Sequence, residues 1–497
     1  MDYRVIKVQR LSESAITTLP NDVERSGYDR KQLRNGVVHL GIGAFHRAHQ
    51  AIVFDDAARK GDMRWGIVGA SLRSASVCDS LVPQDCLYSV VEREGNAERV
   101  RIVGVLRDVM VAQYQAEVLV NVMSAADTHL VTLTVTEKGY HLDPVTGKLI
   151  ESSADVVADL ASLEKPRTAA GLIVAALAKR RASGLKPFTA ISCDNLPHNG
   201  KRLMNAVLAI AQKHDPALHD WIATQGAFPE TMVDRIVPAT DENAIIALSH
   251  HIGVEDRAMI RTEPFLQWVI QNKFAGERPA FESLGVQLTD AVAPWEEAKL
   301  RMLNGAHSGI AYLGALAGIN YVHEVVAIPS AYQFVELLWN ESEATLSPPP
   351  GLDIKAYRVA LMQRFSNAAL QHRTRQIAMD GSQKLPQRLL AAIAVRLQRN
   401  LAVEMQSLAV AAWMQWQTGN DDAGNAHVVD DPLAHVTAAK LQGMHDAKSR
   451  VAALLSIEAI FPPALAANQV FRDTLVKWLD MLMTQGSRAT LERAVAN

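Results

Sequence analysis

An amine, an amide and an imidazole stand close together in a stretch of the chain whose pattern predicts a helix. Lys299 is followed five residues later by Asn304 and eight residues later by His307. At about 100° per residue, Asn304 lies about 140° and His307 about 80° from Lys299, so the three can converge on one small ligand. A lysine in a dry cleft can exchange protons near neutral pH, and an amide can donate to an oxygen that gains negative charge. The spacing predicts acid–base chemistry, with a solvated face of an amphipathic helix as the alternative.

A glycine turn near the N-terminus predicts a dinucleotide site. Gly41 and Gly43 follow the β-type run 37–40 and precede a helical pattern that continues through Ala58. In a βαβ unit such glycines let the backbone approach a pyrophosphate, whose charge then lies at the positive end of the helix. The motif is incomplete, because His46 stands where its third glycine would be.

Polar residues follow three further β-type runs, which cover 65–72, 130–135 and 188–192. In an open parallel sheet, ligands bind outside the carboxyl ends of the strands, so these ends predict a cofactor crevice. The residues that follow the runs are Arg73, Thr136, Glu137, Asp194 and Asn195.

Two of these positions have simpler local interpretations. Asp194 and Asn195 precede turn-forming residues and a helix start near Gly200, so a helix-capping role is the favoured reading of the local sequence. Further along, the adjacent Asp234 and Arg235 read first as a structural ion pair.

Cysteine and histidine spacing predicts no metal centre. Cys78, Cys86 and Cys193 include no C-x-x-C pair, which suits a reducing compartment and offers no disulfide framework. His46 and His49 have a spacing of three, but no third ligand accompanies them.

Length and composition indicate a globular protein. The 497 residues suffice for two or three domains, and 48% of them are hydrophobic. Fifty basic and fifty-three acidic residues give a net charge of −3, with no basic block for nucleic acid or an anionic membrane. Residues 1–14 lack the apolar core of a signal peptide, and the apolar run 401–414 is short and contains Glu404. We expect a cytoplasmic protein without membrane spans, either a monomer or a small homo-oligomer.

The character of the sequence changes near residue 290. Ala/Leu/Met/Gln-rich segments predict helices in the C-terminal part, with a Pro-rich break at 347–350. The predicted fold class is therefore α/β, with an α/β domain over 1–290 followed by a mostly α-helical domain over 291–497. The helical segments cover 299–318, 355–370, 387–417 and 434–457.

Five ordered motifs together resemble the mannitol dehydrogenase family, the polyol-specific long-chain dehydrogenases that include fructuronate reductases. The resemblance covers nearly the whole chain. It implies a zinc-independent, nicotinamide-dependent enzyme with an N-terminal Rossmann-type domain, a helical substrate domain and an active site between them. The motifs are GIGAFHRAH (41–49), TVTEKGY (134–140), SCDN (192–195), MVDRIVP (232–238) and K-x5-N-x2-H (299–307).

Carried over position by position, the resemblance implies roles for the polar residues. Lys299 would be the general acid/base, and Asn195 and Asn304 would be paired amides around the reacting oxygen. His307 would bind a substrate hydroxyl. Glu296, three residues before Lys299, would relay the proton to solvent or form a helical ion pair.

On the cofactor side, the resemblance implies one group of residues at the pyrophosphate, a second near the nicotinamide and one acid close to cofactor and substrate. These are, in order, Gly41, Gly43, Phe45 and Arg47, then Thr136 and Glu137, then Asp234.

The choice between NAD and NADP depends on the end of the run 65–72. An acid there would accept from the ribose hydroxyls and repel a 2′-phosphate, but this chain has Arg73 followed by Ser-Ala-Ser. Fructuronate reductases also tend to lack the acid yet use NAD. We therefore expect NAD and leave NADP open, because Arg73 could pair with a 2′-phosphate.

Residues 372–388 are more similar to fructuronate reductases than to mannitol dehydrogenases. Gln376 and Lys138 stand where mannitol dehydrogenases tend to have Arg and Gly. A sugar acid needs a cation for its carboxylate, and Arg373, Lys384 and Arg301 are available nearby in sequence.

In the opposite direction, the segment 196–199 is more similar to the mannitol branch. We expect D-mannonate/D-fructuronate interconversion, with a neutral polyol such as mannitol or arabinitol as the alternative substrate.

Two other classes of protein remain as alternatives. A zinc-dependent uronate aldolase or isomerase would need carboxylates and histidines around a metal, and a non-catalytic sugar-binding or regulatory protein would not need Lys299 with two amides.

Overall fold

The computed structural model describes residues 9–143 and 146–496. The chain divides into two compact units, Met1–Val292 and Ala293–Asn497. The first eight residues of the N-terminal segment considered above lie outside the described residues.

The first unit is built on a parallel five-stranded sheet with the strand order β6-β3-β2-β7-β8. Its strands are short apolar runs that are almost wholly buried, as expected for a sheet covered on both faces. Val37 lies opposite Ile67 on one side and Leu130 on the other, so the predicted runs pair in register. The bounds are β2 Val37–Leu40, β3 Ile67–Ser71, β6 Leu106–Val111, β7 Leu130–Leu133 and β8 Thr189–Ser192.

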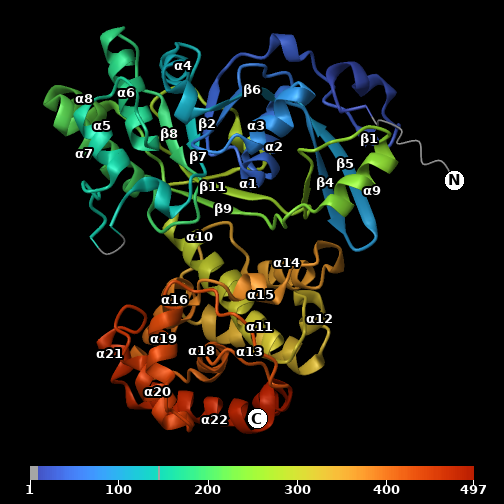
Figure 1. Cartoon of the computed structure of the whole chain (residues 1–497), viewed down its shortest axis with the longest axis vertical. Coiled ribbons are helices and arrows are strands. Elements are labelled where there is room, and N and C mark those ends of the chain that lie inside the picture. Colours follow the sequence, from blue (N-terminus) through green and yellow to red (C-terminus); the bar gives the residue numbers. More distant parts are fainter. Residues whose placement is uncertain (1–8, 144–145, 497) are drawn as a thin grey trace. The chain divides into compact units, whose positions relative to one another are not determined.

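Helices cover both faces of this sheet, which makes it a Rossmann-type doubly wound fold. Figure 1 shows α5–α8 gathered beside β8. The helical pattern predicted through Ala58 forms, but His49 interrupts it because its backbone is non-helical (φ −123°, ψ −86°). The helices are α1 Ala44–Ala48, α2 Gln50–Arg59, α3 Ser76–Leu81, α4 Ala112–Ser124, α5 Ala154–Ala161, α6 Ala169–Ala182, α7 Asn199–His214 and α8 Pro216–Gln225.

Two smaller sheets complete the first unit. One has the order β1-β5-β4-β10, and α9 (Glu242–Ile252) buries Leu248 and Ile252 against it. The other has the order β12-β11-β9. The strands are β1 Val23–Glu24, β4 Tyr88–Glu94, β5 Ala97–Val103, β9 Thr231–Asp234, β10 Ile260–Thr262, β11 Gln267–Gln271 and β12 Gln287–Thr289.

The second unit is helical and has one apolar core, with α11 buried along its whole length. Two π-helical segments, η6 (Lys299–Asn304) and η8 (Pro386–Leu390), interrupt the α-helical pattern. The α-helices are α10 Ala293–Ala298, α11 Gly305–Leu316, α12 Val322–Val326, α13 Pro329–Glu343, α14 Ile354–Phe365, α15 Thr374–Ala378, α16 Gly381–Leu385, α17 Ala391–Gln398, α18 Glu404–Trp416, α19 Ala434–Leu441, α20 Ala447–Leu455, α21 Pro463–Ala466 and α22 Gln469–Val495.

The long helices expected in this unit are shorter than their apolar patterns. The segment 387–417 breaks after α17, where Asn400 adopts a left-handed conformation (φ 55°), and the segment 434–457 breaks at Gly443 (φ 76°). Left-handed residues of this kind end helices because they satisfy the last carbonyls. The predicted Pro-rich break at 347–350 is confirmed between α13 and α14.

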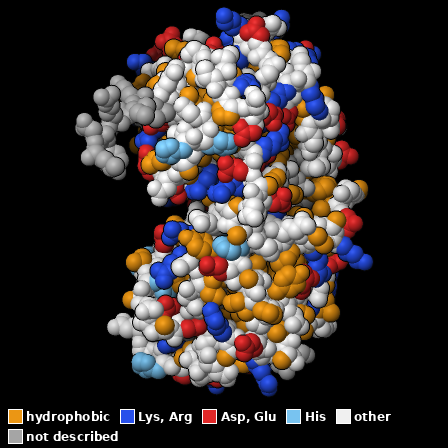
Figure 2. Space-filling view, turned by 90° about the vertical axis from the view of Figure 1, so that its right-hand side faces the viewer, with side chains coloured by type: hydrophobic (Ala, Val, Ile, Leu, Met, Phe, Trp, Pro, Cys, Tyr) orange, Lys and Arg blue, Asp and Glu red, His pale blue; other side chains and the backbone are white. Residues whose placement is uncertain are grey.

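In the part of the chain that the structure describes, no helix combines the length and the apolarity that crossing a membrane requires. The apolar run 401–414 instead forms most of α18, which is buried in the core of the second unit. Figure 2 shows acidic and basic side chains on the surface of each unit.

Candidate active site

A pocket of about 350 Å³ lies at the carboxyl ends of β2, β3 and β7 in the first unit. This is where the strand ends were expected to form a cofactor crevice. Its lining includes Gly41, Leu72, Arg73, Thr136, Lys138 and Arg167. The three cations among these residues give the pocket a positive lining that suits the phosphates of a dinucleotide.

The glycine turn has the shape that a closely approaching phosphate needs. Gly41 has φ +96°, and a Cβ there would stand 2.1 Å from the carbonyl oxygen of Thr134, so only glycine fits. A Cβ on Gly43 would meet nothing nearer than 3.8 Å, which leaves the N-terminus of α1 open. Phe45 is half-buried and stacks on the ring of His49. These residues fit a bound nicotinamide dinucleotide.

Arg47 was also expected at the pyrophosphate, but its side chain has other partners in the structure. Its side chain is buried, donates to the carbonyl of Ala258 and lies over the ring of Tyr88, 5.5 Å from the ring centroid. The arginine connects α1 to the segment before β10. The sequence could not show this, because Ala258 lies more than two hundred positions away.

Asp194 is not a helix cap, contrary to the favoured reading of its local sequence. The N-cap of α7 is His198, which makes no side-chain cap. One carboxylate oxygen of Asp194 accepts from the N–H of Thr136 (2.8 Å), and the other accepts from the N–H of Val135 (3.1 Å) and the hydroxyl of Tyr140 (2.6 Å). Burial raises the pKa of Asp194, and the three hydrogen bonds oppose that rise.

This network holds the turn that follows β7. Thr136 is exposed and has φ +67° with ψ 167°, a conformation that costs a non-glycine residue about 1–3 kcal/mol. Thr136 and the neighbouring Glu137 were both expected near the nicotinamide, and both are exposed at the carboxyl end of the sheet. Asp194 and Tyr140 are therefore positioning residues that the sequence reading missed. The sequence carries one sign of them: Asp194 lies in the motif 192–195, and Tyr140 lies in the motif 134–140.

Arg73 has a carboxylate partner that was not expected. Its Nη2 lies 2.6 Å from Oδ2 of Asp155, in the first turn of α5. The Arg73 side chain is 72% exposed, so this ion pair is weak. An acid therefore stands beside Arg73, although the end of β3 supplies none.

The Asp234–Arg235 dipeptide separates into two roles. Arg235 pairs with Glu92 rather than with its neighbour, at 2.5 Å, and also donates to the carbonyls of Glu263 and Ala48. It is a structural residue that connects three elements of the first unit. Asp234 is the last residue of β9 and is buried.

The histidines at 46 and 49 have separate surroundings. His46 stacks on His39, with ring centroids 3.3 Å apart, whereas Nε2 of His49 donates to the carbonyl of Gln267 at 2.8 Å. Among the described residues, no group of three or more histidine, cysteine or acidic side chains could hold a metal ion.

In the second unit, Lys299, Asn304 and His307 are all buried, at 7%, 8% and 6% exposure. The expected straight α-helix is wrong here, because 299–304 is the π-helix η6. Since π-helical hydrogen bonds join residues five apart and each residue turns the helix by less than 100°, Asn304 lies closer in angle to Lys299 than the roughly 140° of an α-helix. The three side chains therefore lie closer to one stripe than α-helical geometry predicts.

His307 lies in an apolar and cationic environment. Its ring contacts Phe365 (4.6 Å between centroids) and meets His372 edge-on (5.3 Å). Burial, and then the charges of His372, Arg364 and Arg388, hold the pKa of His307 well below its usual value. The imidazole is therefore neutral at pH 7 and suits a substrate hydroxyl.

Buried polar atoms without partners cluster around this stripe. Within residues 9–143 and 146–496, Nδ2 of Asn304, Nε2 of His307 and Nδ1 of His372 have no hydrogen-bond partner. Buried polar groups are usually hydrogen-bonded in folded proteins, and a bound water or ligand is one way to supply the partner. The arrangement can therefore bind a small polyhydroxylated molecule.

The three cations proposed for a substrate carboxylate differ in their surroundings. Arg301 donates to the carbonyl and hydroxyl of Thr345 (2.7 and 3.1 Å) and pairs with Glu297 at 3.4 Å, so it is structural. Arg373 is exposed and lies over the ring of Tyr321.

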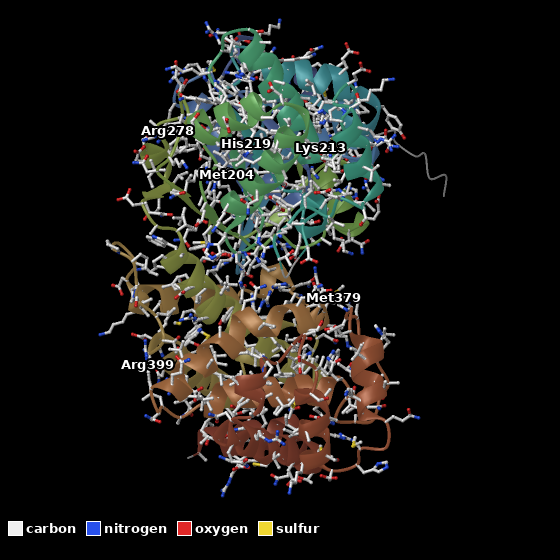
Figure 3. The ribbon with its side chains drawn as sticks, turned by 90° about the vertical axis from the view of Figure 1, so that its left-hand side faces the viewer. Met204, Lys213, His219, Arg278, Met379 and Arg399 are labelled. Carbon is white, nitrogen blue, oxygen red and sulfur yellow. The ribbon has the colours of Figure 1, made fainter. Side chains whose placement is uncertain are left out.

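Lys384 is the half-buried member of the set. Its Nζ donates to the carbonyl of Met379, a residue labelled in Figure 3, and lies 3.8 Å from a carboxylate oxygen of Asp380. Burial, and then Arg388, lower the pKa of Lys384 to about 8.

Two further expected residues lie where their elements place them. Glu296 is half-buried on α10, one helical turn before Lys299. Asn195 is exposed just after β8 in the first unit. Their proposed roles as proton relay and as second amide remain predictions.

Both units match one family. Residues 35–283 match the mannitol dehydrogenase Rossmann domain, and residues 291–483 match the mannitol dehydrogenase C-terminal domain. The Rossmann domain implies a nicotinamide cofactor.

Individual relatives align over nearly the whole chain. D-mannonate oxidoreductase of Escherichia coli (strain K12) is 40% identical over 94% of this chain and 97% of its own length. Mannitol 2-dehydrogenase of Pyrenophora tritici-repentis is 38% identical over 97% of this chain and 86% of its own length. The structure of Pseudomonas fluorescens mannitol 2-dehydrogenase, a ternary complex with NAD and D-mannitol, superposes with a TM-score of 0.88 at 35% identity, covering 98% of this chain and 100% of that one. The chain is thus an oxidoreductase that belongs to the mannitol dehydrogenase family.

Proposed function

We propose that this protein transfers a hydride reversibly between a nicotinamide cofactor and a C5/C6 sugar acid, interconverting D-mannonate and D-fructuronate. The observation that carries the proposal is the buried stripe of Lys299, Asn304 and His307, which the π-helix η6 brings toward one angular position. The 40% identity to D-mannonate oxidoreductase over most of both chains supports the same reaction.

Each residue of the stripe has a role in that reaction. The neutral amine of Lys299 takes the proton of a secondary alcohol during oxidation and returns it during reduction. The amides of Asn304 and Asn195 donate to the oxygen as it becomes alkoxide-like, each contributing about 2.7–4 kcal/mol if well aligned. His307 binds a substrate hydroxyl, and Glu296 exchanges the proton with solvent. When bound, the nicotinamide supplies or accepts the hydride.

We propose NAD as the cofactor. Gly41, Gly43 and Phe45 form the side of the crevice that meets the pyrophosphate, and Thr136 and Glu137 lie toward the nicotinamide. The Asp155 carboxylate beside Arg73 opposes a 2′-phosphate. NADP is the alternative cofactor, because Arg73 also lines the pocket.

A neutral polyol is the second candidate substrate. The similarity to mannitol 2-dehydrogenases, including one whose structure contains D-mannitol, favours it. The reaction and the roles of Lys299 and the amides would be the same, and only the group at the far end of the substrate would differ.

The purified protein should be assayed by nicotinamide absorbance with D-mannonate, D-mannitol, D-arabinitol, D-fructuronate and D-fructose, each with NAD and with NADP. We expect the highest kcat/KM for D-mannonate with NAD, unchanged after treatment with a chelator. A preference for mannitol or arabinitol would select the polyol alternative. The absence of turnover with every substrate, or loss of activity with the chelator, would contradict the proposed function.

A further inference from the structure

Arg388 is a half-buried guanidinium beside the candidate catalytic stripe. It lies on η8, and its Nη1 is 3.3 Å from the hydroxyl oxygen of Ser308 and 3.5 Å from the carbonyl oxygen of Asn304. Both contacts are long, and both partners are neutral. These contacts leave donors of a five-donor side chain available.

In the part of the chain that the structure describes, no carboxylate lies within ion-pair distance of Arg388. Burial lowers the pKa of Arg388 to about 10. Tyr312 and Asp380 raise this pKa, but by less than burial lowers it. Asp380 lies nearer Lys384, at 3.8 Å from its Nζ. A desolvated guanidinium without a counter-ion is costly, so the structure favours an anion at this position.

The other cations in this region are less suited to that anion. Arg301 uses its donors on Thr345 and Glu297, and Arg373 is exposed over Tyr321. Lys384 donates to backbone carbonyls and lies near Asp380. Arg388 is thus the best placed of these cations for a carboxylate. It was not among the three cations that the sequence suggested.

A second, independent observation indicates a ligand beside Arg388. Asn304 and His307 are more than nine-tenths buried, and one polar nitrogen of each has no partner. Asn304 also contributes the carbonyl that Arg388 approaches. One molecule with hydroxyl groups and an anionic end would satisfy both the unpartnered nitrogens and the guanidinium.

The backbone permits this arrangement through a glycine. η6 and η8 pack against each other, and a Cβ on Gly305 would stand 3.0 Å from the carbonyl oxygen of Arg388. Glycine therefore lets the two π-helical segments approach closely. This approach brings the guanidinium next to the last residue of η6 and to Ser308, one helical turn further on.

We propose that Arg388 binds the carboxylate of a sugar acid substrate and so sets the preference for a sugar acid over a neutral polyol. The inference rests on the proposed function, because it assigns a specificity-determining residue to the same site. A guanidinium can hold a carboxylate through two parallel hydrogen bonds, which gives orientation as well as affinity.

The test compares kcat/KM for D-mannonate with kcat/KM for D-mannitol in the wild type, Arg388→Gln, Arg388→Lys and the matched control Arg375→Gln, at an exposed arginine on α15. The wild type should prefer D-mannonate. Arg388→Gln should reduce kcat/KM for D-mannonate by about ten- to a hundredfold and leave that for D-mannitol within about threefold. Arg388→Lys should retain part of the preference, because it keeps the charge but loses the fork. Arg375→Gln should leave the ratio of the two values unchanged.

The ratio separates the possible failures. An equal loss of both activities in Arg388→Gln overturns the role of Arg388, because only D-mannonate carries the carboxylate that this residue is proposed to bind. An unchanged preference in that variant overturns it as well. A wild type that turns over D-mannitol but not D-mannonate overturns both this inference and the sugar-acid reaction, whereas a wild type without any nicotinamide-dependent turnover overturns the proposed function itself.

Discussion

Asp194, just beyond β8, accepts a hydrogen bond from the backbone N–H of Thr136, just beyond β7. The distance from the Thr136 nitrogen to Oδ1 of Asp194 is 2.8 Å. This bond connects two neighbouring strand ends at the carboxyl edge of the sheet, where a dinucleotide binds in doubly wound folds. It also explains how Thr136 keeps its unfavourable backbone conformation.

Asp194→Asn should destabilise this turn. An amide replaces one accepting oxygen by a donor, so either Val135 or Thr136 is left with an unsatisfied N–H. We expect a loss of about 1–3 kcal/mol in the free energy of unfolding and a higher KM for NAD. Denaturant unfolding and NAD titration measure the two effects. Asp241→Asn is the matched control, because it changes an exposed helix cap that accepts from Ala244 and that asparagine can replace. Equal behaviour of the two variants would remove Asp194 from the positioning of the turn.

Lys299→Ala should lower kcat by about 10²–10⁴-fold and leave NAD affinity nearly unchanged, because the amine acts on the substrate oxygen. Lys299→Arg should be equally inactive, since a guanidinium keeps the charge but does not exchange protons near neutral pH. Initial rates and NAD binding measure this. The control is Lys201→Ala, at an exposed position on α7. Substantial activity in Lys299→Arg would show that only the charge matters.

Asn304→Ala should mainly lower kcat, because a hydrogen bond to the reacting oxygen strengthens as alkoxide charge develops. The side-chain nitrogen of Asn304 has no partner within the described residues, so its loss breaks no bond of the folded protein. We expect a decrease of up to about a hundredfold in kcat with little change in thermal stability. Asn195→Ala should behave alike. An effect confined to KM would assign both amides to substrate binding alone.

Asp155→Asn should raise activity with NADP relative to NAD. Removing the carboxylate frees Arg73 for a 2′-phosphate and removes a repulsive charge. We expect the ratio of kcat/KM for NADP to that for NAD to rise about three- to tenfold, in line with a weak exposed ion pair. Arg73→Asp should lower it. Asp79→Asn changes an exposed acid on nearby α3 and serves as the control. A ratio that does not respond to Asp155→Asn would place cofactor discrimination elsewhere.

The pH dependence should identify any contribution of Lys384. Its pKa is lowered to about 8 by burial and by Arg388, while Asp380, Asp431 and Asp430 oppose the shift. The side chain is therefore cationic below pH 8 and neutral above it. The ratio of kcat/KM for D-mannonate to that for D-mannitol should fall up to about fivefold as the pH rises from 7 to 9.5. Using the ratio cancels every effect of pH that the two substrates share. Lys384→Met should remove most of this fall, because Arg388, with a pKa of about 10, stays mainly charged up to about pH 9.5. A fall that persists in Lys384→Met would assign it to another group.

Much of the fold was predictable because its signals are local. The strands β2, β3, β7 and β8 are apolar runs bounded by turn residues, and Gly41 marks a turn that only glycine can form. The spacing of Lys299, Asn304 and His307 indicated acid–base chemistry, and five ordered motifs indicated the family. Such features follow from backbone geometry and side-chain type over a few residues.

Tertiary structure decided which polar groups have partners. Arg47 donates a hydrogen bond to Ala258, Asp194 accepts one from Thr136, and Arg73 forms an ion pair with Asp155. Each of these interactions joins residues from separate elements. The π-helical register of Lys299 and Asn304 has no signal in hydrophobic periodicity, because it depends on how η6 packs in the second unit. The same holds for Arg388: whether a guanidinium has a counter-ion is set by which elements surround it, and segments distant in sequence determine that.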